Sequence, residues 1–302
     1  MKPDKEIFER ISASVGRDVA LLEKDYYVVQ VIKKLSELQF DNGRLLFGGG
    51  TSLFKGHKVI NRFSEDIDFR FVSEAPLNRN QKSKIKHKIT EFLEALPDFT
   101  FHETPRAQNG NTKIDYRLKY PQADSSPRDG LRPYIRLEVF FAGVNYPAVS
   151  RSIGSLYNEY AGAVPEVEFS CVALEDTAID KVSAFLWRVL SRDRTVPLGT
   201  LHNDPTIIRH LHDIALLKGR IVIEGKFKRL LTETLKNDMQ NRAHQEVSLR
   251  EAFGKVAELL STDRRYRQEY RQYVDSVSLD PDNKRLSFDA ALKVFEELAG
   301  MV

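Results

Sequence analysis

Two aspartates, Asp66 and Asp68, stand two positions apart at the start of a short apolar run that continues to Val72. In a β-strand, alternate side chains point to the same face, so the two carboxylates share one face while Ile67 and Phe69 take the other. Two carboxylates held this close repel each other unless a cation lies between them, and Mg²⁺ binds such oxygens at roughly 2.0–2.1 Å. The spacing therefore predicts a divalent-metal site; the alternative is a solvated edge strand.

A glycine run, Gly48-Gly49-Gly50, precedes the aspartates. Glycines let the backbone approach a ligand closely, and the helix expected from Thr51 would direct its first N–H groups at a phosphate. Thr51 and Ser52 add two hydroxyl groups. A Walker A loop and a dinucleotide fingerprint are excluded, because a lysine precedes the next glycine and no third glycine falls at the required spacing. The run favours the metal site over the solvated strand.

The remaining segments predict the elements that position these residues. Apolar residues at helical spacing predict two opening helices within 6–40, the second capped by Asp18. Apolar and alternating runs predict strands at 44–47, 67–72, 99–102, 113–120, 134–142 and 167–172. Helices are expected at about 80–96, 175–194, 204–219, 226–240, 244–261, 262–277 and 287–299. The polar segment 121–133 is expected to be a mobile lid or a long hairpin.

Three short stretches carry a resemblance to a known family. The residues GGTSLFK at 49–55, RFSEDID at 62–68 and EKDYYV at 23–28 resemble the AbiEii/AbiGii nucleotidyltransferase toxin family, which belongs to the polymerase-β-like superfamily and is similar to MenT-type toxins. The resemblance implies an α/β (α+β) nucleotidyltransferase core with a mixed sheet and N-terminal helices at 1–172. An all-α C-terminal domain is expected at 173–302.

The resemblance also implies a role for residues outside the first motif. A third metal-binding carboxylate is expected on a later central strand, where Glu138 is the candidate; an ion pair with Arg136 or a neighbour is its alternative role. Lys181 resembles the family's motif lysine. Asp213 keeps the match to a later motif, although His210 stands where many relatives have aspartate. The predicted site consists of catalytic Asp66, Asp68, Lys181 and Asp213; nucleotide-binding Gly49, Gly50, Thr51, Ser52, Lys55, Ser64 and Arg188; and metal-binding Asp66, Asp68 and Glu138.

Helical spacing leaves the roles of the later charged residues open. Lys181, Arg188 and Arg192 share one helix face, which would either bind a triphosphate or lie in solvent. Arg209 and Asp213 are four apart, so a surface ion pair worth about 0.3–0.5 kcal/mol is the alternative to an active-site role.

Composition limits the class of protein. The 302 residues are 41% hydrophobic and 29% charged, as in soluble globular chains, and a net charge of +3 does not by itself indicate a nucleic-acid binder. The single cysteine, Cys171, excludes an internal disulfide and suits a reducing cytoplasm. No run approaches the roughly 20 apolar residues of a membrane span, and the charged N-terminus does not resemble a signal peptide. We therefore expect a cytoplasmic protein with no membrane partner.

The implied activity is nucleotidyl transfer from a nucleoside triphosphate, with Mg²⁺ or Mn²⁺, to an RNA acceptor, the 3′ end of tRNA, by the toxin of a phage-defence toxin–antitoxin system with a cognate antitoxin encoded nearby. In some relatives a Ser or Thr near the metal pair is phosphorylated, and Ser64 occupies that place. The alternatives are an enzyme of the same fold that modifies a protein hydroxyl, or a non-catalytic nucleotide- or RNA-binding module. The segment 264–273, which interleaves arginines with tyrosines, favours RNA, the alternative being a solvated helix stripe.

Overall fold

The computed structural model describes residues 5–16, 18–108, 112–122, 131–240 and 247–302. The chain divides into two compact units, each described by itself below. The first contains residues 1–58 and 64–173, and the second contains residues 59–63 and 174–302. None of the described helices combines the length and the apolar character needed to cross a membrane.

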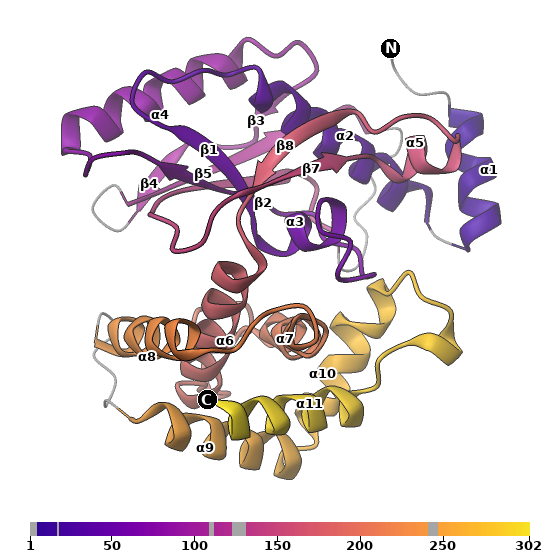
Figure 1. Ribbon diagram of the computed structural model, residues 1–302. Coiled ribbons are helices and arrows are strands. Elements are labelled where there is room, and N and C mark those ends of the chain that lie inside the picture. The colour runs from indigo at the N-terminus through magenta and orange to yellow at the C-terminus, as the bar shows by residue number, and fades with distance from the viewer. Residues whose placement is uncertain (1–4, 17, 109–111, 123–130, 241–246) are drawn as a thin grey trace. The chain divides into compact units, whose positions relative to one another are not determined.

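One mixed β-sheet forms the centre of the first unit (Figure 1). Its strands are β1 (Arg44–Gly48), β2 (Ile67–Val72), β3 (Thr100–Phe101), β4 (Arg106–Gln108), β5 (Lys113–Lys119), β6 (Ile135–Phe141), β7 (Val149–Ile153) and β8 (Val167–Cys171). Their order is β3-β5-β6-β2-β1-β8-β7, with β4 also paired to β5. The central strand β2 is antiparallel to β1 and parallel to β6, so the sheet places β2 between two neighbours.

Alternation along the strands gives the sheet one apolar and one charged face. Ile67, Phe69 and Phe71 of β2 are buried, whereas the residues between them are only partly buried. The apolar face belongs to a core that also receives side chains from the helices α2 and α4. The helices of this unit are α1 (Lys5–Val15), α2 (Val19–Ser36), α3 (Gly49–Lys55), α4 (Arg79–Glu94) and α5 (Leu156–Tyr160). Asp66 and Asp68 therefore lie on the face opposite α4.

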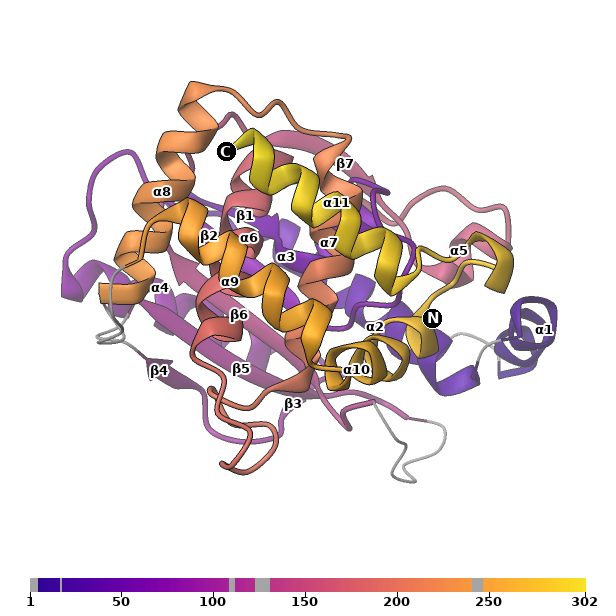
Figure 2. The same ribbon diagram turned by 90° about the horizontal axis from the view of Figure 1, so that it is seen from below.

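The second unit is helical. It contains α6 (Leu174–Leu190), η2 (Pro205–Ile208), α7 (Arg209–Lys218), α8 (Gly225–Gln240), α9 (Leu249–Thr262), α10 (Arg265–Tyr273), η3 (Asp275–Val277), η4 (Asp282–Lys284) and α11 (Phe288–Met301). Helix α6 packs against α7, α8 and α9, while α11 packs against α7 and α9 (Figure 2). The Phe295 ring lies between Phe185 and Phe253, with ring centroids 5.5 Å and 4.9 Å away. The segment 59–63 joins this unit through backbone hydrogen bonds to Val277 and Leu279.

The predicted fold class, an α/β core with a mixed sheet followed by helices, is confirmed. The Asp18 side chain caps α2 as expected, accepting a hydrogen bond of 2.8 Å from the backbone N–H of Ala20. Strands β4 and β7 and helix α5 were not predicted. In the expected lid or hairpin, residues 123–130 lie outside the described part of the chain. The domain limits at 172 and 173 stay a prediction.

Candidate active site

Gly49 brings the backbone against Asp68, one of the two aspartates predicted to be catalytic. Its φ of +68° is in the left-handed region that favours glycine, and a Cβ atom there would lie 1.9 Å from Asp68 Oδ2. The preceding residue, Gly48, pairs in register with Asp68 across β1 and β2. The close approach expected of the glycine run is therefore, in this structure, an approach to the Asp68 carboxylate.

Strand register places three carboxylates, those of Asp68, Glu138 and Asp115, in a row across β2, β6 and β5, called the carboxylate row below. Asp68 of β2 pairs with Glu138 of β6, and Glu138 pairs with Asp115 of β5. Paired residues project to the same face, so the three acidic side chains lie side by side on the charged face. Glu138 and Asp115 are buried, at 7% and 5% exposure. Asp115 was not predicted, although the alternation of the segment 113–119 places it on this face.

Cations meet this row from the same strands. Arg136 Nη2 lies 2.8 Å from Asp115 Oδ2 and 2.6 Å from Glu138 Oε1, and Lys113 also pairs with Glu138. Burial disfavours the charged guanidinium, but the hydrogen bonds to Asp115 and the charge of Glu138 outweigh it and raise the pKa of Arg136. The ion pair between Glu138 and Arg136, the alternative role considered for Glu138, is thus present. Metal binding by Glu138 stays a prediction.

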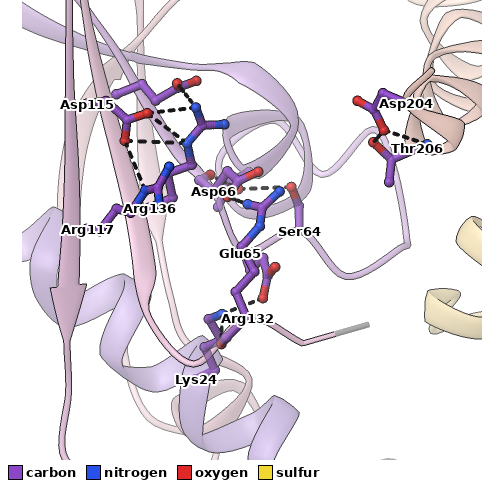
Figure 3. A network of polar contacts seen from close by, with 12 residues as sticks. Lys24, Ser64, Glu65, Asp66, Asp115, Arg117, Arg132, Arg136, Asp204 and Thr206 are labelled. Atoms are coloured by element: carbon purple, nitrogen blue, oxygen red, sulfur yellow. Dashed lines mark hydrogen bonds and ion pairs between the residues drawn. The ribbon is translucent and has the colours of Figure 1, made fainter. Parts of the chain in front are cut away.

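Asp66 lies just before β2 and is held through its backbone and its carboxylate (Figure 3). Thr51 Oγ1 donates a hydrogen bond to the Asp66 carbonyl oxygen and lies 3.0 Å from Ser64 Oγ. The Arg132 guanidinium pairs with the Asp66 carboxylate. Helix α3 therefore positions the first aspartate, because the Thr51 hydroxyl contacts both Ser64 and Asp66.

A buried lysine of α2 lies beneath this pair (Figure 3). Lys24 has no exposed surface; its Nζ is 2.5 Å from Glu65 Oε2 and donates a hydrogen bond of 2.7 Å to the Arg132 carbonyl oxygen. Burial lowers the pKa of Lys24 and raises the pKa of Glu65, and each charge partly opposes the shift of the other. Lys24 thus fixes the residue before Asp66 and the backbone of Arg132.

A second buried ion pair joins α2 to the end of α3. Lys55 Nζ lies 2.5 Å from Asp25 Oδ1, both residues are almost fully buried, and Asp25 Oδ2 accepts a hydrogen bond of 2.6 Å from the backbone N–H of Leu156. Thr51 and Ser52 are also buried. Thr51 Oγ1 and Lys55 Nζ already bind within the fold, to the Asp66 carbonyl and to Asp25, and nucleotide binding by Thr51, Ser52 and Lys55 stays a prediction.

In the second unit, two cations converge on one aspartate. Asp213 has no exposed surface; Arg62 Nε and Nη2 donate hydrogen bonds of 2.8 Å and 2.7 Å to its two oxygens, and Lys181 Nζ is 2.8 Å away. Burial acts to raise the pKa of Asp213, but Arg62 and Lys181 overcome it and hold the pKa well below its usual range. Burial, reinforced by Lys181, lowers the pKa of His210 well below its usual value, so its imidazole is neutral at pH 7. The surface ion pair between Arg209 and Asp213, considered as an alternative, is not how Asp213 is held.

The comparisons with known proteins decide the family. The family model described as "Nucleotidyl transferase AbiEii toxin, Type IV TA system" matches residues 30–294, which include the carboxylate row and Asp213. The chain belongs to the AbiEii nucleotidyltransferase toxin family.

Solved structures are similar to this AbiEii-family chain. One is MenT4, a nucleotidyltransferase toxin from Mycobacterium tuberculosis H37Rv, at 17% identity and a TM-score of 0.53, covering 97% of this chain and 99% of that chain. This likeness shows the fold. A second is an antigenic nucleotidyltransferase-like protein from Paracoccidioides brasiliensis, at 19% identity and a TM-score of 0.39, covering 73% of this chain and 89% of that chain. No curated protein matches the chain.

The other predicted cations of the AbiEii-family chain are paired. Arg188 Nη2 lies 2.8 Å from Asp204 Oδ2. Arg192 is bonded to Glu269 at 2.7 Å and 2.8 Å, so neither side chain lies free in solvent. Two of the three tyrosines of α10, Tyr266 and Tyr270, are 3% and 0% exposed, and the third, Tyr273, is partly exposed. The segment 264–273 therefore presents its two buried rings to the helical core, and the sequence argument that they stack on RNA bases is wrong for these two residues.

The family implies a divalent metal, for which the predicted ligands are Asp66, Asp68 and Glu138. Asp66, Asp68 and Glu138 supply the hard oxygen donors that Mg²⁺ and Mn²⁺ prefer. Within the described parts of the chain, however, no three carboxylate, histidine or cysteine side chains are grouped closely enough to hold an ion. Arg132 and Arg136 now meet two of these carboxylates. The oxygen donors fit a divalent metal. Metal binding requires Arg132 and Arg136 to give up their ion pairs with Asp66 and Glu138.

Proposed function

We propose that this AbiEii-family toxin transfers a nucleotide from a nucleoside triphosphate to the 3′ hydroxyl of an RNA, with the tRNA 3′ end as acceptor and Mg²⁺ or Mn²⁺ as cofactor. The observation that carries the proposal is the carboxylate row, in which Asp68 lies against the Gly49 backbone and beside Glu138. In the reaction, the hydroxyl oxygen forms a bond to the α-phosphorus, the bond from the α-phosphorus to the β-phosphate oxygen breaks, and pyrophosphate and the hydroxyl proton are released.

Each part of the chain has a role in this proposal. Asp66, Asp68 and Glu138 would hold the divalent metal, which when bound offsets the charge that develops on the phosphates. Gly49, Gly50 and Ser64, partly exposed beside the aspartates, contact the nucleotide. Lys181 neutralises the triphosphate, and Asp213 holds the Lys181 ammonium in position. Arg188 adds a second cation on the same helix.

The RNA acceptor draws its support from helix α4. Six of the ten residues from Arg79 to Lys88 are basic or histidine, and no acidic residue lies among them. Arg79 and Lys82 lie in the first turn, where the helix dipole disfavours cations, so these two charges do not serve helix stability. Because α4 covers the sheet face opposite the carboxylates, it would contact the body of a large RNA rather than its reacting end.

The first experiment tests the reaction. Purified protein is incubated with total RNA, Mg²⁺ and each α-³²P-labelled nucleoside triphosphate in turn, beside the variant Asp68→Ala. The exposed Asp98→Ala is the matched control, since it removes an aspartate of the same unit away from the carboxylate row. Label in a tRNA-sized band with wild type and Asp98→Ala, but not with Asp68→Ala, is the expected result. Label on protein, or no label, would reject the proposal.

The second experiment tests the acceptor surface. In the double variant Lys84→Glu, Lys88→Glu, two exposed cations of α4 become anions. The Kd for full-length tRNA should rise at least roughly tenfold, and the slope of log K against log salt should fall by about 2 in magnitude, while a short oligonucleotide acceptor is used as before. An equal loss of affinity for full-length tRNA and for the short oligonucleotide would show that α4 does not contact the RNA body.

Two regulatory features of the family are carried over as part of the proposal. A cognate antitoxin would oppose the toxin, as the type IV toxin–antitoxin description of the matched family implies. Ser64 is a candidate phosphorylation site, because the residue is partly exposed and its hydroxyl contacts Thr51, which holds the Asp66 backbone. A phosphate there would add negative charge next to the catalytic carboxylates and oppose nucleotide binding.

A further inference from the structure

Arg132 is the exposed member of the network around Asp66. The Arg132 and Asp66 side chains are 39% and 32% exposed, whereas those of Lys24 and Glu65 are 0% and 11% exposed. An ion pair open to water is weak and is easily exchanged, while a buried pair is not. The arginine that faces the catalytic carboxylate is therefore the cation of this network that can change partners.

The backbone at Arg132 and Pro133 is nevertheless held by two side-chain hydrogen bonds. The Arg132 carbonyl oxygen accepts the hydrogen bond from Lys24, and the carbonyl oxygen of Pro133 accepts one of 2.8 Å from Gln122 Nε2. A fixed backbone with an accessible head group confines the guanidinium to the neighbourhood of Asp66. The planar guanidinium also matches phosphate oxygens with two parallel hydrogen bonds.

We propose that Arg132 is a nucleotide-binding residue that exchanges Asp66 for the triphosphate. In the free protein its guanidinium neutralises Asp66. When a divalent metal arrives at Asp66, the guanidinium transfers to the phosphates that enter with it, so every charge keeps a partner. The inference rests on the proposed function and adds to it a phosphate-binding residue and a competition between Arg132 and the metal for one carboxylate.

The exchange predicts opposite changes in two affinities of the variant Arg132→Gln. Without nucleotide, the Kd for Mn²⁺ should fall about two- to fivefold, because a competing cation is removed from an exposed ion pair. With Mn²⁺ present, the Kd for the nucleotide should rise by roughly tenfold or more, because a charged bidentate contact to phosphate is lost. Arg132→Lys keeps the charge without the planar fork, so the Mn²⁺ affinity should stay near that of wild type while the nucleotide affinity falls.

The measurement uses the full-length protein without turnover. Free Mn²⁺ is followed by electron paramagnetic resonance, and the α,β-methylene analogues of the four common nucleoside triphosphates are titrated by calorimetry in the presence of Mn²⁺. Arg106→Gln is the matched control, because Arg106, at the start of β4, pairs with Glu103 at 3.2 Å and its side chain is 64% exposed. Thermal unfolding of each variant verifies that it folds.

Opposite shifts in Arg132→Gln, with Arg106→Gln unchanged, support the exchange. Weaker binding of both Mn²⁺ and nucleotide would mean that Arg132 only positions Asp66. Unchanged binding of either ligand would mean that Arg132 does not compete with the metal or does not bind the triphosphate. Each of these results overturns the proposed exchange. If the wild type bound neither Mn²⁺ nor any analogue, the proposed function itself would fail as well. Failure of the exchange alone leaves wild-type binding intact, so the two failures are distinguishable.

Discussion

Substituting Gly49 by alanine tests whether the glycine run exists to place the Asp68 carboxylate. The new Cβ would lie 1.9 Å from Asp68 Oδ2, 2.7 Å from its Cγ and 2.9 Å from its Cβ. Rotation of the carboxylate relieves the first two contacts. It does not relieve the third, because Asp68 Cβ is fixed by the strand backbone. The backbone of the glycine run or the start of β2 must therefore shift.

The magnitude follows from these distances. An ordinary van der Waals contact begins near 3.4 Å, so Oδ2 moves by about 1.5 Å, the difference between 3.4 Å and 1.9 Å. A misplacement of about 1 Å at a reacting centre can cost roughly 100-fold in rate. We expect Gly49→Ala to reduce the single-turnover rate of label transfer by at least roughly 100-fold. The left-handed φ adds a loss of stability of about 1–2 kcal/mol.

Gly162→Ala separates the two effects. Gly162 has φ +63°, close to that of Gly49, but nothing lies within 4 Å of its added Cβ. Both variants should lose the stability that the left-handed φ costs, and Gly49→Ala should lose more in urea unfolding because of its contacts with Asp68, but only Gly49→Ala should lose activity. A Gly49→Ala enzyme that folds and retains activity within threefold of wild type would refute the reasoning, because Asp68 would then tolerate displacement.

Three further predictions concern buried groups. Asp213→Asn should lower the free energy of unfolding at pH 7 by about 3–5 kcal/mol, since Arg62 and Lys181 lose their buried counter-charge; a loss below about 1 kcal/mol in urea unfolding would contradict it. The pKa of His210 is depressed in the folded state, so the unfolded chain binds more protons and stability falls as pH drops through the unfolded pKa near 6.5. His210→Gln should therefore lose less stability than wild type between pH 7 and pH 5. The Cys171 thiol, with a pKa raised to about 11 by burial, should react with a thiol reagent only after unfolding; rapid reaction of the native protein would disprove its burial.

Local pattern was sufficient for most of the fold. Strands such as β2 and β6 are central and mostly apolar, so their periodicity stands out from the sequence. β7 was missed because, among the described strands, it pairs with β8 alone at the end of the sheet, and three of its five residues are exposed. β4 has three residues, too few to show a period.

The candidate site was only partly predictable, since its partners depend on long-range pairing. The spacing of Asp66 and Asp68 is a local signal that a strand converts directly into geometry. The row through Glu138 to Asp115 depends on register between strands far apart in the chain. Arg132 had no local signal, because it follows a polar segment and becomes relevant only where the fold places it beside Asp66.

The opening residues EKDYYV, which resembled the family by sequence alone, have a physical role in positioning the site. Lys24 and Asp25 are consecutive on α2, and each forms a buried ion pair with one end of the predicted catalytic motif. Lys24 pairs with Glu65, next to Asp66, and Asp25 pairs with Lys55, at the end of α3. Buried ion pairs add little net stability, because desolvation offsets their attraction, but a misregistered chain would leave each charge buried without a partner. Two such pairs, one at each end, therefore fix the position of the glycine run and of the first aspartate relative to one helix. This explains why charged residues occupy a helix face that could otherwise have been apolar.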